Sequence, residues 1–307
     1  MRLIFCGTAA FAVPSLEACA DRHDVVAVVT RADRPGDRGR PAPRPVAESA
    51  RARGLDVLTP AKIRAPETVA ALLDLDPDCL VVAAYGQILP TSLIDAPPHG
   101  SVNVHASLLP RWRGASPVAH AILAGDAETG VSIMRVDAGL DTGPVYMQSR
   151  ITIAPDATTP SLTERLAALG AAALLEVLAA LERGEASPRP QPESGVMQAP
   201  RLGRDDGRVD WAARSAVEVD RMVRALQPWP GVLAPLAGVD VQIVAGSPAG
   251  VAGAGEPGAV VGREGESVIV ATHDGGFRLD LVTPPGRRPM TPAAFLRGHR
   301  PGTGGGR

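Results

Sequence analysis

Short apolar runs alternate with helix-like segments in the first half of the chain. Strand-like runs rich in Val, Ile and Leu lie at residues 2–7, 25–30, 56–59 and 79–84. Each run is followed by a loop and then by a segment with helical spacing. This alternation predicts an α/β domain with an open, mainly parallel, Rossmann-like sheet. Such sheets bind ligands beyond the carboxyl ends of their strands.

The pattern changes after residue 184. A helix predicted at residues 161–184 precedes a segment with Pro188, Pro190, Pro192 and Pro200, a composition typical of an extended linker. A helix-like stretch at 216–226 is followed by short strand-like runs that predict a small antiparallel barrel, at residues 232–233, 239–244, 259–261, 267–271 and 277–281. A chain of 307 residues favours two domains. We expect these at residues 1–186 and 205–307, with a linker at 187–204.

Composition narrows the class of protein. The formal net charge of −2 argues against a surface that binds nucleic acid everywhere, although local basic faces remain possible. The three cysteines lack metal-ligand spacing and predict buried free thiols in a reducing compartment, without a disulfide or a zinc site. The sequence shows neither an export leader nor an apolar run of membrane-spanning length. We therefore expect a soluble, cytoplasmic protein.

The strongest candidate chemistry lies in SVNVHASLLPRWRGASP, residues 101–117. Asn103 and His105 share one face of a predicted strand, because side chains alternate between the two faces. An unpaired buried polar group costs about 1 to 3 kcal/mol, so the pair is either bonded within the fold or part of a site. Asp141 follows in VDAGLDTGP, near the tip of a predicted hairpin. Taken alone, Asp141 is equally compatible with a simple turn.

The first predicted strand ends in Gly7-Thr8 without a GxGxxG motif, so neither a nicotinamide nor a flavin cofactor is expected. Several motifs together resemble a known family. They are FCGTAAFA at residues 5–12, TRADRPGDRGR at 30–40, AYGQILP at 84–90, the Asn103 and Asp141 segments, and RVDW and QPWPG in the last third. They resemble the 10-formyltetrahydrofolate-dependent formyltransferases over nearly the whole chain, and in particular the members that formylate methionine on initiator tRNA.

The resemblance implies 10-formyltetrahydrofolate as co-substrate, initiator Met-tRNA as partner, no metal, and an OB-like fold for the second domain. It implies Asn103, His105 and Asp141 as catalytic residues. The folate pocket is implied at Tyr85, Gly86, Gln87, Ile88, Leu89, Ser107, Leu108, Leu109 and Pro110. Contacts with tRNA are implied for Arg38, Arg40 and Arg201, the last of which stands where the family commonly has lysine. We also expect a cis Leu109-Pro110 bond and a monomer.

The residue types suit formyl transfer. An amine attacks the formyl carbon to form a tetrahedral oxyanion, and the folate nitrogen then leaves with a proton. Asn103 can donate its carboxamide N–H to the oxyanion, while His105 can donate a hydrogen bond and deliver a proton near neutral pH. Asp141 would orient His105 and stabilise its charged form. The amine is itself nucleophilic, so no Ser or Cys nucleophile is expected.

Two segments concentrate positive charge. Residues 31–53 contain seven arginines, and the segment from residue 275 to the end contains six. Arginine-rich loops are usually just solvated, but two such segments could together bind the phosphates of an RNA. Three other hypotheses stay open: another small-molecule formyltransferase, acting for example on glycinamide ribonucleotide or a sugar nucleotide, a formyltetrahydrofolate hydrolase, and a non-catalytic RNA-binding protein.

Overall fold

The structure, a computed structural model, describes residues 1–32, 44–250 and 255–299. The chain forms two compact units. The first comprises Met1–Val118, Ala127–Ile153 and Ser161–Pro200, and the second comprises Ala119–Asp126, Ala154–Pro160 and Arg201–Arg307. Residues 187–200, expected as part of a linker, thus group with the first unit. Within the described residues, no helix combines the length and apolar character needed to cross a bilayer.

The first unit is built on a seven-stranded sheet with the order β3-β2-β1-β4-β5-β7-β8. Its strands are β1 (Arg2–Gly7), β2 (Asp24–Val29), β3 (Val57–Leu58), β4 (Cys79–Ala83), β5 (Ser101–His105), β7 (Glu128–Arg135) and β8 (Val145–Thr152). Strands β3, β2, β1, β4 and β5 run parallel, whereas β7 pairs antiparallel with β5 and with β8. The predicted open, mainly parallel sheet is confirmed.

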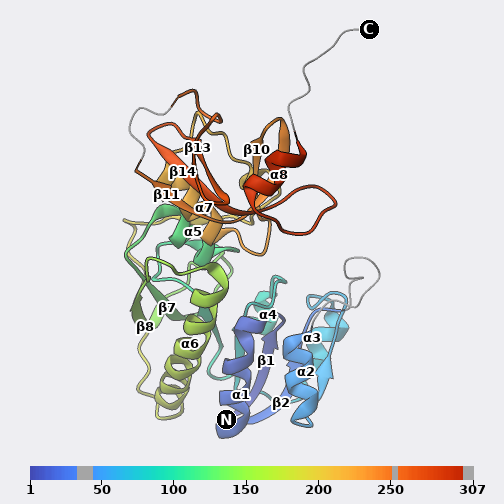
Figure 1. The fold of residues 1–307 in the computed structure, drawn as a ribbon. Helices are drawn as coiled ribbons and strands as arrows, with labels where there is room; N and C mark the ends of the chain where they lie inside the picture. Colours follow the sequence, from blue (N-terminus) through green and yellow to red (C-terminus); the bar gives the residue numbers. More distant parts are fainter. Residues whose placement is uncertain (33–43, 251–254, 300–307) are drawn as a thin grey trace. The chain divides into compact units, whose positions relative to one another are not determined.

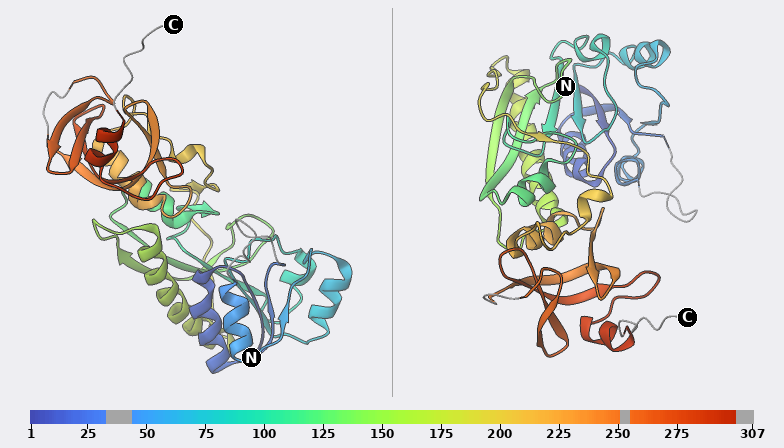
Figure 2. Two further views of the ribbon diagram at one scale, coloured as in Figure 1. Left: turned by 45° about the vertical axis from the view of Figure 1, so that its right-hand side comes forward. Right: turned by 90° about the horizontal axis from the view of Figure 1, so that it is seen from above.

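Helices cover both faces of this sheet. They are α1 (Val13–Arg22), α2 (Pro45–Ala52), α3 (Pro66–Leu73), α4 (Thr91–Ile94) and α6 (Thr159–Glu182). Figures 1 and 2 show α1, α2 and α6 in one layer beside the strands. Strand residues Ile4, Cys6 and Leu80 pack instead with Leu72 of α3 and Leu93 of α4, in a core where all five side chains are almost fully buried. The alternate side chains of these strands point to the opposite face of the sheet.

Helix α6 packs directly behind β5. A Cβ atom built on Gly170 would lie 2.8 Å from Val104 Cγ1 and 3.4 Å from Val131 Cγ1, so a larger residue would push the helix from the sheet. Val104 therefore faces α6. Because side chains alternate along a strand, Asn103 and His105 face the opposite side. The sequence of β5 thus gives the strand an apolar face toward α6 and an opposite face that carries Asn103 and His105.

The second unit contains a five-stranded antiparallel sheet with the order β10-β11-β14-β13-β12. Its elements are α7 (Ala216–Ala225), β10 (Val232–Leu236), β11 (Val239–Ala249), β12 (Val260–Glu264), β13 (Ser267–Ala271), β14 (Gly276–Thr283) and α8 (Pro292–Gly298). Helix α5 (Pro117–Ala124) is shared in sequence between the units. Irregular pairing around Ala245 bends β11 against β14, as expected for a partly open barrel of short strands. The predicted small β domain is confirmed.

Candidate active site

Asn103 and His105 lie at the carboxyl end of β5, between β4 and β7. Val82 and Met134 pair with Asn103 on either side, and Ser132 pairs with His105. His105 is buried, whereas Asn103 is part-buried. Among the described residues, the Asn103 carboxamide has no hydrogen-bond partner. Its N–H groups are therefore available to a substrate, as an oxyanion donor requires.

Asp141 joins His105 from the loop between β7 and β8. Asp141 Oδ1 lies 3.7 Å from His105 Nδ1, and the two side chains are only 14% and 6% exposed. This low exposure strengthens their electrostatic interaction relative to a surface pair. On its other side, His105 Nε2 lies 2.9 Å from the Trp112 carbonyl oxygen. A carbonyl only accepts, so Nε2 carries the hydrogen in this arrangement.

The position of Asp141 is fixed by its neighbours. The Gly114 N–H donates to Asp141 Oδ2 over 2.8 Å. The Asp141 main chain has φ 53°, in the left-handed region that Asp tolerates better than most residues. Gln191 Nε2 donates to the Asp141 carbonyl oxygen over 2.8 Å. The structure thus brings Asp141 to His105, on the face of β5 that also carries Asn103.

A second set of bonds shapes the loop that follows β5. Ser132 Oγ accepts from Leu109 N over 3.0 Å and donates to the Ser107 carbonyl over 2.7 Å. Gln148 Nε2 donates to the Leu109 carbonyl over 2.8 Å and to Ser132 Oγ over 3.0 Å. The expected cis Leu109-Pro110 bond is confirmed. Sequence reasoning missed Ser132 and Gln148, although each is a polar residue within a strand-like run.

The residues expected to hold the folate occupy two loops. Residues 85–89 follow β4, and residues 107–110 follow β5, so both leave the same edge of the parallel sheet. Ile88 is 82% exposed and offers an open apolar surface. Gly86 has φ 82°, and a Cβ there would lie 3.3 Å from an Arg31 guanidinium nitrogen. Glycine thus permits both the turn and the close approach of Arg31.

Three of these side chains already have other surroundings. The Ser107 hydroxyl is buried and donates to the Arg111 carbonyl over 2.6 Å. Gln87 Oε1 accepts from Ile63 N over 3.1 Å. The Tyr85 ring lies in the core with Ile4 and Cys6, and burial raises the pKa of its hydroxyl. The side chains of these three residues are thus bonded or buried within the fold.

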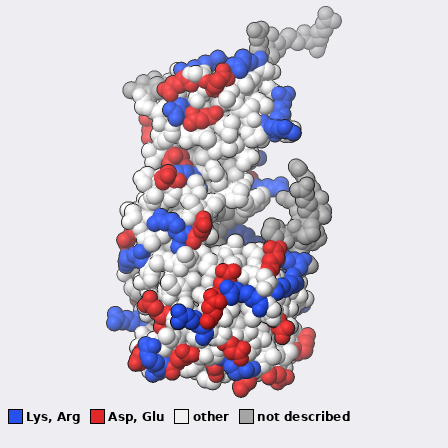
Figure 3. All heavy atoms as spheres, turned by 60° about the horizontal axis from the view of Figure 1, so that its bottom comes forward, with Lys and Arg blue, Asp and Glu red and all other residues white. Residues whose placement is uncertain are grey.

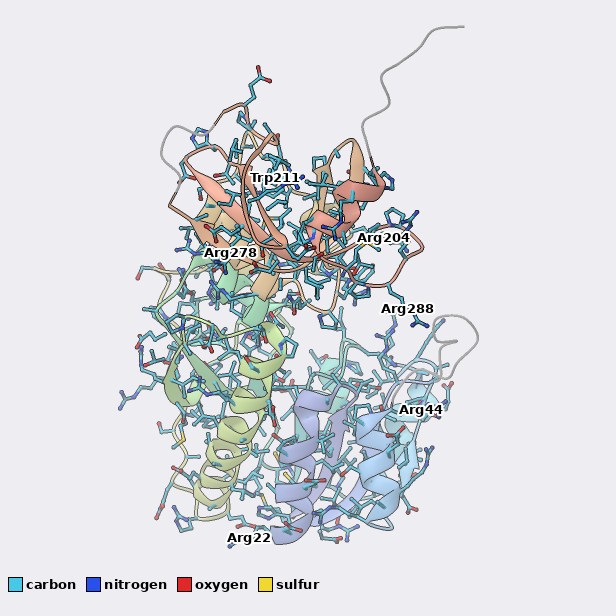
Figure 4. All side chains as sticks on the ribbon, viewed as in Figure 1. Arg22, Arg44, Arg204, Trp211, Arg278 and Arg288 are labelled. Atoms are coloured by element: carbon cyan, nitrogen blue, oxygen red, sulfur yellow. The ribbon has the colours of Figure 1, made fainter. Side chains whose placement is uncertain are left out.

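Of the three residues expected to contact tRNA, the structure describes only one. Arg38 and Arg40 lie outside the described residues. Arg201 is exposed at the start of the last segment of the second unit. In the same unit Figure 4 shows Arg204 and Arg288 projecting from loops, whereas Arg278 lies on β14. On the face seen in Figure 3, basic and acidic side chains are interspersed, in keeping with the near-zero net charge.

Other chemistry finds little support among the described residues. No group of three or more His, Cys, Asp or Glu side chains in these ranges is arranged to hold a metal ion. Burial raises the pKa of the Cys6, Cys19 and Cys79 thiols from 9.0 to about 12. A thiol is a nucleophile only as its thiolate, so these cysteines are inert at neutral pH.

At the carboxyl edge of an α/β sheet, a carboxamide and an imidazole of β5 thus lie beside a carboxylate from the β7–β8 loop, a set of groups typical of enzymes that use acid–base chemistry. Family profiles identify the class: "Formyl transferase" matches residues 1–178, and "Formyl transferase, C-terminal domain" matches residues 201–300. The chain belongs to the formyl transferase family. A protein of Myxococcus xanthus (strain DK1622) named methionyl-tRNA formyltransferase is 48% identical over 301 residues, covering 97% of this chain and 95% of the relative.

Solved structures share the fold at lower identity. The N-formyltransferase of Helicobacter canadensis, in complex with folinic acid and dTDP-3-aminofucose, has a TM-score of 0.69 and 18% identity, covering 92% of this chain and 99% of that one. HypX of Aquifex aeolicus, in complex with tetrahydrofolic acid, has a TM-score of 0.64 and 20% identity, covering 96% of this chain and 47% of that one. At such identities the likeness concerns the fold alone.

Proposed function

We propose that this protein transfers the formyl group of 10-formyltetrahydrofolate to the α-amino group of methionine on initiator Met-tRNA. The observation that carries the proposal is the meeting of Asn103, His105 and Asp141 in a chain that resembles methionyl-tRNA formyltransferases over nearly its whole length. The acceptor is chosen from the likeness to the Myxococcus xanthus protein named methionyl-tRNA formyltransferase, which is 48% identical and covers 97% of this chain.

The transfer is direct. The neutral α-amino nitrogen attacks the formyl carbon, the bond from that carbon to the folate nitrogen breaks, and one proton passes from the amine to the departing nitrogen. Asn103 donates its N–H to the oxyanion of the tetrahedral intermediate. His105 donates a hydrogen bond to the reacting group and moves the proton, while Asp141 stabilises the imidazolium form across 3.7 Å.

His105 must change partners to act in this way. Its Nε2–H is directed at the Trp112 carbonyl, 2.9 Å away, and its Nδ1 faces Asp141. The Trp112 main chain has φ 64°, an unfavourable conformation for a bulky residue. We propose that substrate binding displaces the Trp112 carbonyl, so that Nε2 can reach the formyl group. Histidine geometry in a ligand-free site commonly tightens only in the reacting complex.

The folate lies in this proposal across the two loops at residues 85–89 and 107–110. Main-chain groups near Gly86 and Leu89 would read the edge of the pterin, and Ile88 would cover one of its apolar faces. Arg38, Arg40 and Arg201 would bind tRNA phosphates, and residues 205–307 would form the RNA-binding domain. A monomer in the cytoplasm completes the proposal, and light scattering of the purified protein checks the monomer.

The test is a transfer assay with 10-formyltetrahydrofolate and alternative acceptors. Initiator Met-tRNA, elongator Met-tRNA, glycinamide ribonucleotide and an amino-sugar nucleotide are compared at equal concentration, and the formylated product is quantified. We expect initiator Met-tRNA to give the highest kcat/KM. A higher kcat/KM for either small acceptor, or hydrolysis of the formyl donor without transfer, would overturn the proposal.

A further inference from the structure

The segment between the two family profiles is bonded to the catalytic loops. Two-residue strands β6 (Arg113–Gly114) and β9 (Gln198–Ala199) pair in parallel. Further upstream, Val145 and Arg189 exchange two main-chain hydrogen bonds of 2.8 Å. Residues 189–199 therefore run from the start of β8 to the loop after β5, and are anchored at both ends.

Gln191 lies between these anchors and is part-buried. Its Nε2 donates to the main-chain oxygens of Asp141 and Gly143, both over 2.8 Å. Its Oε1 accepts from Arg113 Nε over 3.1 Å and from Arg113 Nη2 over 2.7 Å. A carboxamide has two N–H donors and an oxygen with two lone pairs, so every hydrogen-bonding position of this side chain is occupied.

These four bonds link the two loops that meet at His105. Arg113 precedes Gly114, whose N–H holds the Asp141 carboxylate over 2.8 Å. Gln191 holds the Asp141 main chain from the other side. The carboxylate that faces His105 is thus fixed at its side chain by one loop and at its main chain by Gln191.

We infer that Gln191 is a positioning residue for formyl transfer, which holds the Asp141 loop against the Arg113 loop and so aligns Asp141 with His105. None of its four hydrogen bonds goes to His105 or Asn103, so its effect passes through Asp141. The inference rests on the proposed function for its catalytic consequence. A displacement of about 1 Å at a reacting group can lower the rate by about 100-fold, which is the scale of effect expected.

Two variants separate the roles of the carboxamide. Gln191→Met keeps the length of the side chain but removes all four bonds without adding charge. Gln191→Glu retains an acceptor for Arg113, yet it places a carboxylate oxygen against the carbonyls of Asp141 and Gly143, where a donor is required. If the role of Gln191 passes through Asp141, Glu should be at least as harmful as Met.

The matched control is Gln198→Met. Gln198 lies in the same segment and is exposed, and its side chain makes no hydrogen bond with a described residue. We expect both Gln191 variants to lower kcat by about 10 to 100-fold, with KM for the formyl donor within about threefold of the parent. Gln198→Met should match the parent, and the melting temperature of each variant shows whether it is folded.

Hydrogen exchange supplies a readout that is independent of activity. In the substrate-free protein, amides of residues 137–143 should exchange faster in both Gln191 variants than in the parent and in Gln198→Met. Parent-like kcat in Gln191→Glu, or unchanged exchange in this loop, would overturn the inference. A parent protein inactive on Met-tRNA would instead refute the proposed function, and the exchange comparison would still decide whether Gln191 holds the loop.

Discussion

Around β5 in the first unit, buried or part-buried polar side chains bond to the main chain. In the second unit, charged side chains at the surface bond to one another. Ser132, Gln148 and Gln191 each bond to main-chain groups of a catalytic loop. In the second unit, Arg278 pairs with Asp280, and Arg297 pairs with Glu266. All four of these charged side chains are 33% or more exposed.

The difference concerns what each kind of contact can do. A buried amide bonded to a carbonyl fixes a loop, because leaving either group unpaired costs about 1 to 3 kcal/mol. An exposed ion pair contributes about 0 to 1 kcal/mol and weakens with salt. The first unit is therefore suited to hold reacting groups within fractions of an ångström. The ion pairs of the second unit fix little geometry, and each pair neutralises its own charge.

The largest losses of turnover should follow from substitutions at Asn103 and His105, on the polar face of β5. We expect Asn103→Ala to lower kcat by about 100 to 1,000-fold, because the oxyanion loses a preorganised donor. His105→Ala should be of similar size. Asn103→Ala should melt near the parent temperature, since Asn103 makes no hydrogen bond with a described residue. His105→Ala should melt lower, because it removes a buried side chain that bonds to the Trp112 carbonyl. Steady-state kinetics check the prediction, and turnover within about threefold of the parent in either variant would contradict the roles given to these residues.

Asp141→Asn should have a smaller but clear effect. The carboxylate is 3.7 Å from His105 Nδ1, beyond a good hydrogen bond, so its influence is mainly electrostatic. An asparagine oxygen could still accept from Gly114 N, which leaves the loop in place. We expect kcat to fall by about 10 to 100-fold. Glu128→Gln is the control, because this carboxylate on β7 is exposed and pairs with Arg150. If Glu128→Gln lost as much kcat as Asp141→Asn, the loss could not be attributed to the charge beside His105.

Charge removal in the second unit should change affinity and leave the chemical step intact. Arg288 is exposed, and among the described residues its side chain has no ion pair. If it contacts a tRNA phosphate, Arg288→Ala should weaken tRNA binding several-fold and reduce the logarithmic salt slope by up to about 0.9. Arg278→Ala is the comparison, since Arg278 already bonds to Asp280 and Glu264. Identical slopes for parent and Arg288→Ala would exclude this contact.

The smallest expected effect is on stability at alkaline pH. It concerns the three cysteines, all of which lie in the first unit. Burial raises the pKa of each folded thiol from 9.0 to about 12. Between these values the unfolded chain loses protons that the folded protein keeps. The contribution of the buried neutral thiols to the stability of the folded protein is therefore fully present below pH 9, and it is lost as the pH rises towards 12. Each thiol can lower the free energy of unfolding by up to about 1.4 kcal/mol per pH unit.

Denaturant unfolding at pH 8 and pH 10 tests this alkaline loss, with probes specific to each unit. The first unit should be destabilised at pH 10 more than the cysteine-free second unit. At pH 8, a thiol reagent should label the folded protein slowly and the unfolded protein completely. Rapid labelling of the native protein would mean that the thiols are not buried as described.

Several elements could be predicted from the sequence because their signals are local. The apolar run at residues 2–7 matches β1 (Arg2–Gly7), and the helix expected at 161–184 matches α6 (Thr159–Glu182) within two residues. Strand β11 continues to Ala249, beyond the expected end at 244. Gly246 and Pro248 have little strand preference of their own, and the pairing with β14 imposes their conformation.

The site could be predicted only in part. Asn103 and His105 share a strand face, which alternation alone reveals. The contact of Asp141 with His105 depends on a loop that folds back over the sheet. The bonds of Gln191 to Arg113, 78 residues apart, have no local signature because two extended segments meet there. A polar residue within a strand-like run, such as Ser132 or Gln148, is the one signal that could have pointed to the supporting bonds.

The pairing of β6 with β9 also bears on where the gene could be divided. A fragment that stops after α6 would encode the entire sheet and the three expected catalytic residues, yet it would lack β9 and the Arg189 pairing with Val145. A recombination between two relatives at that point would combine the catalytic loops of one protein with residues 189–199 of the other. A junction at residue 200 keeps residues 189–199 with the loops that they pair with. We therefore expect recombinants within this family to fold when joined there, and to be less stable when joined about fifteen residues earlier.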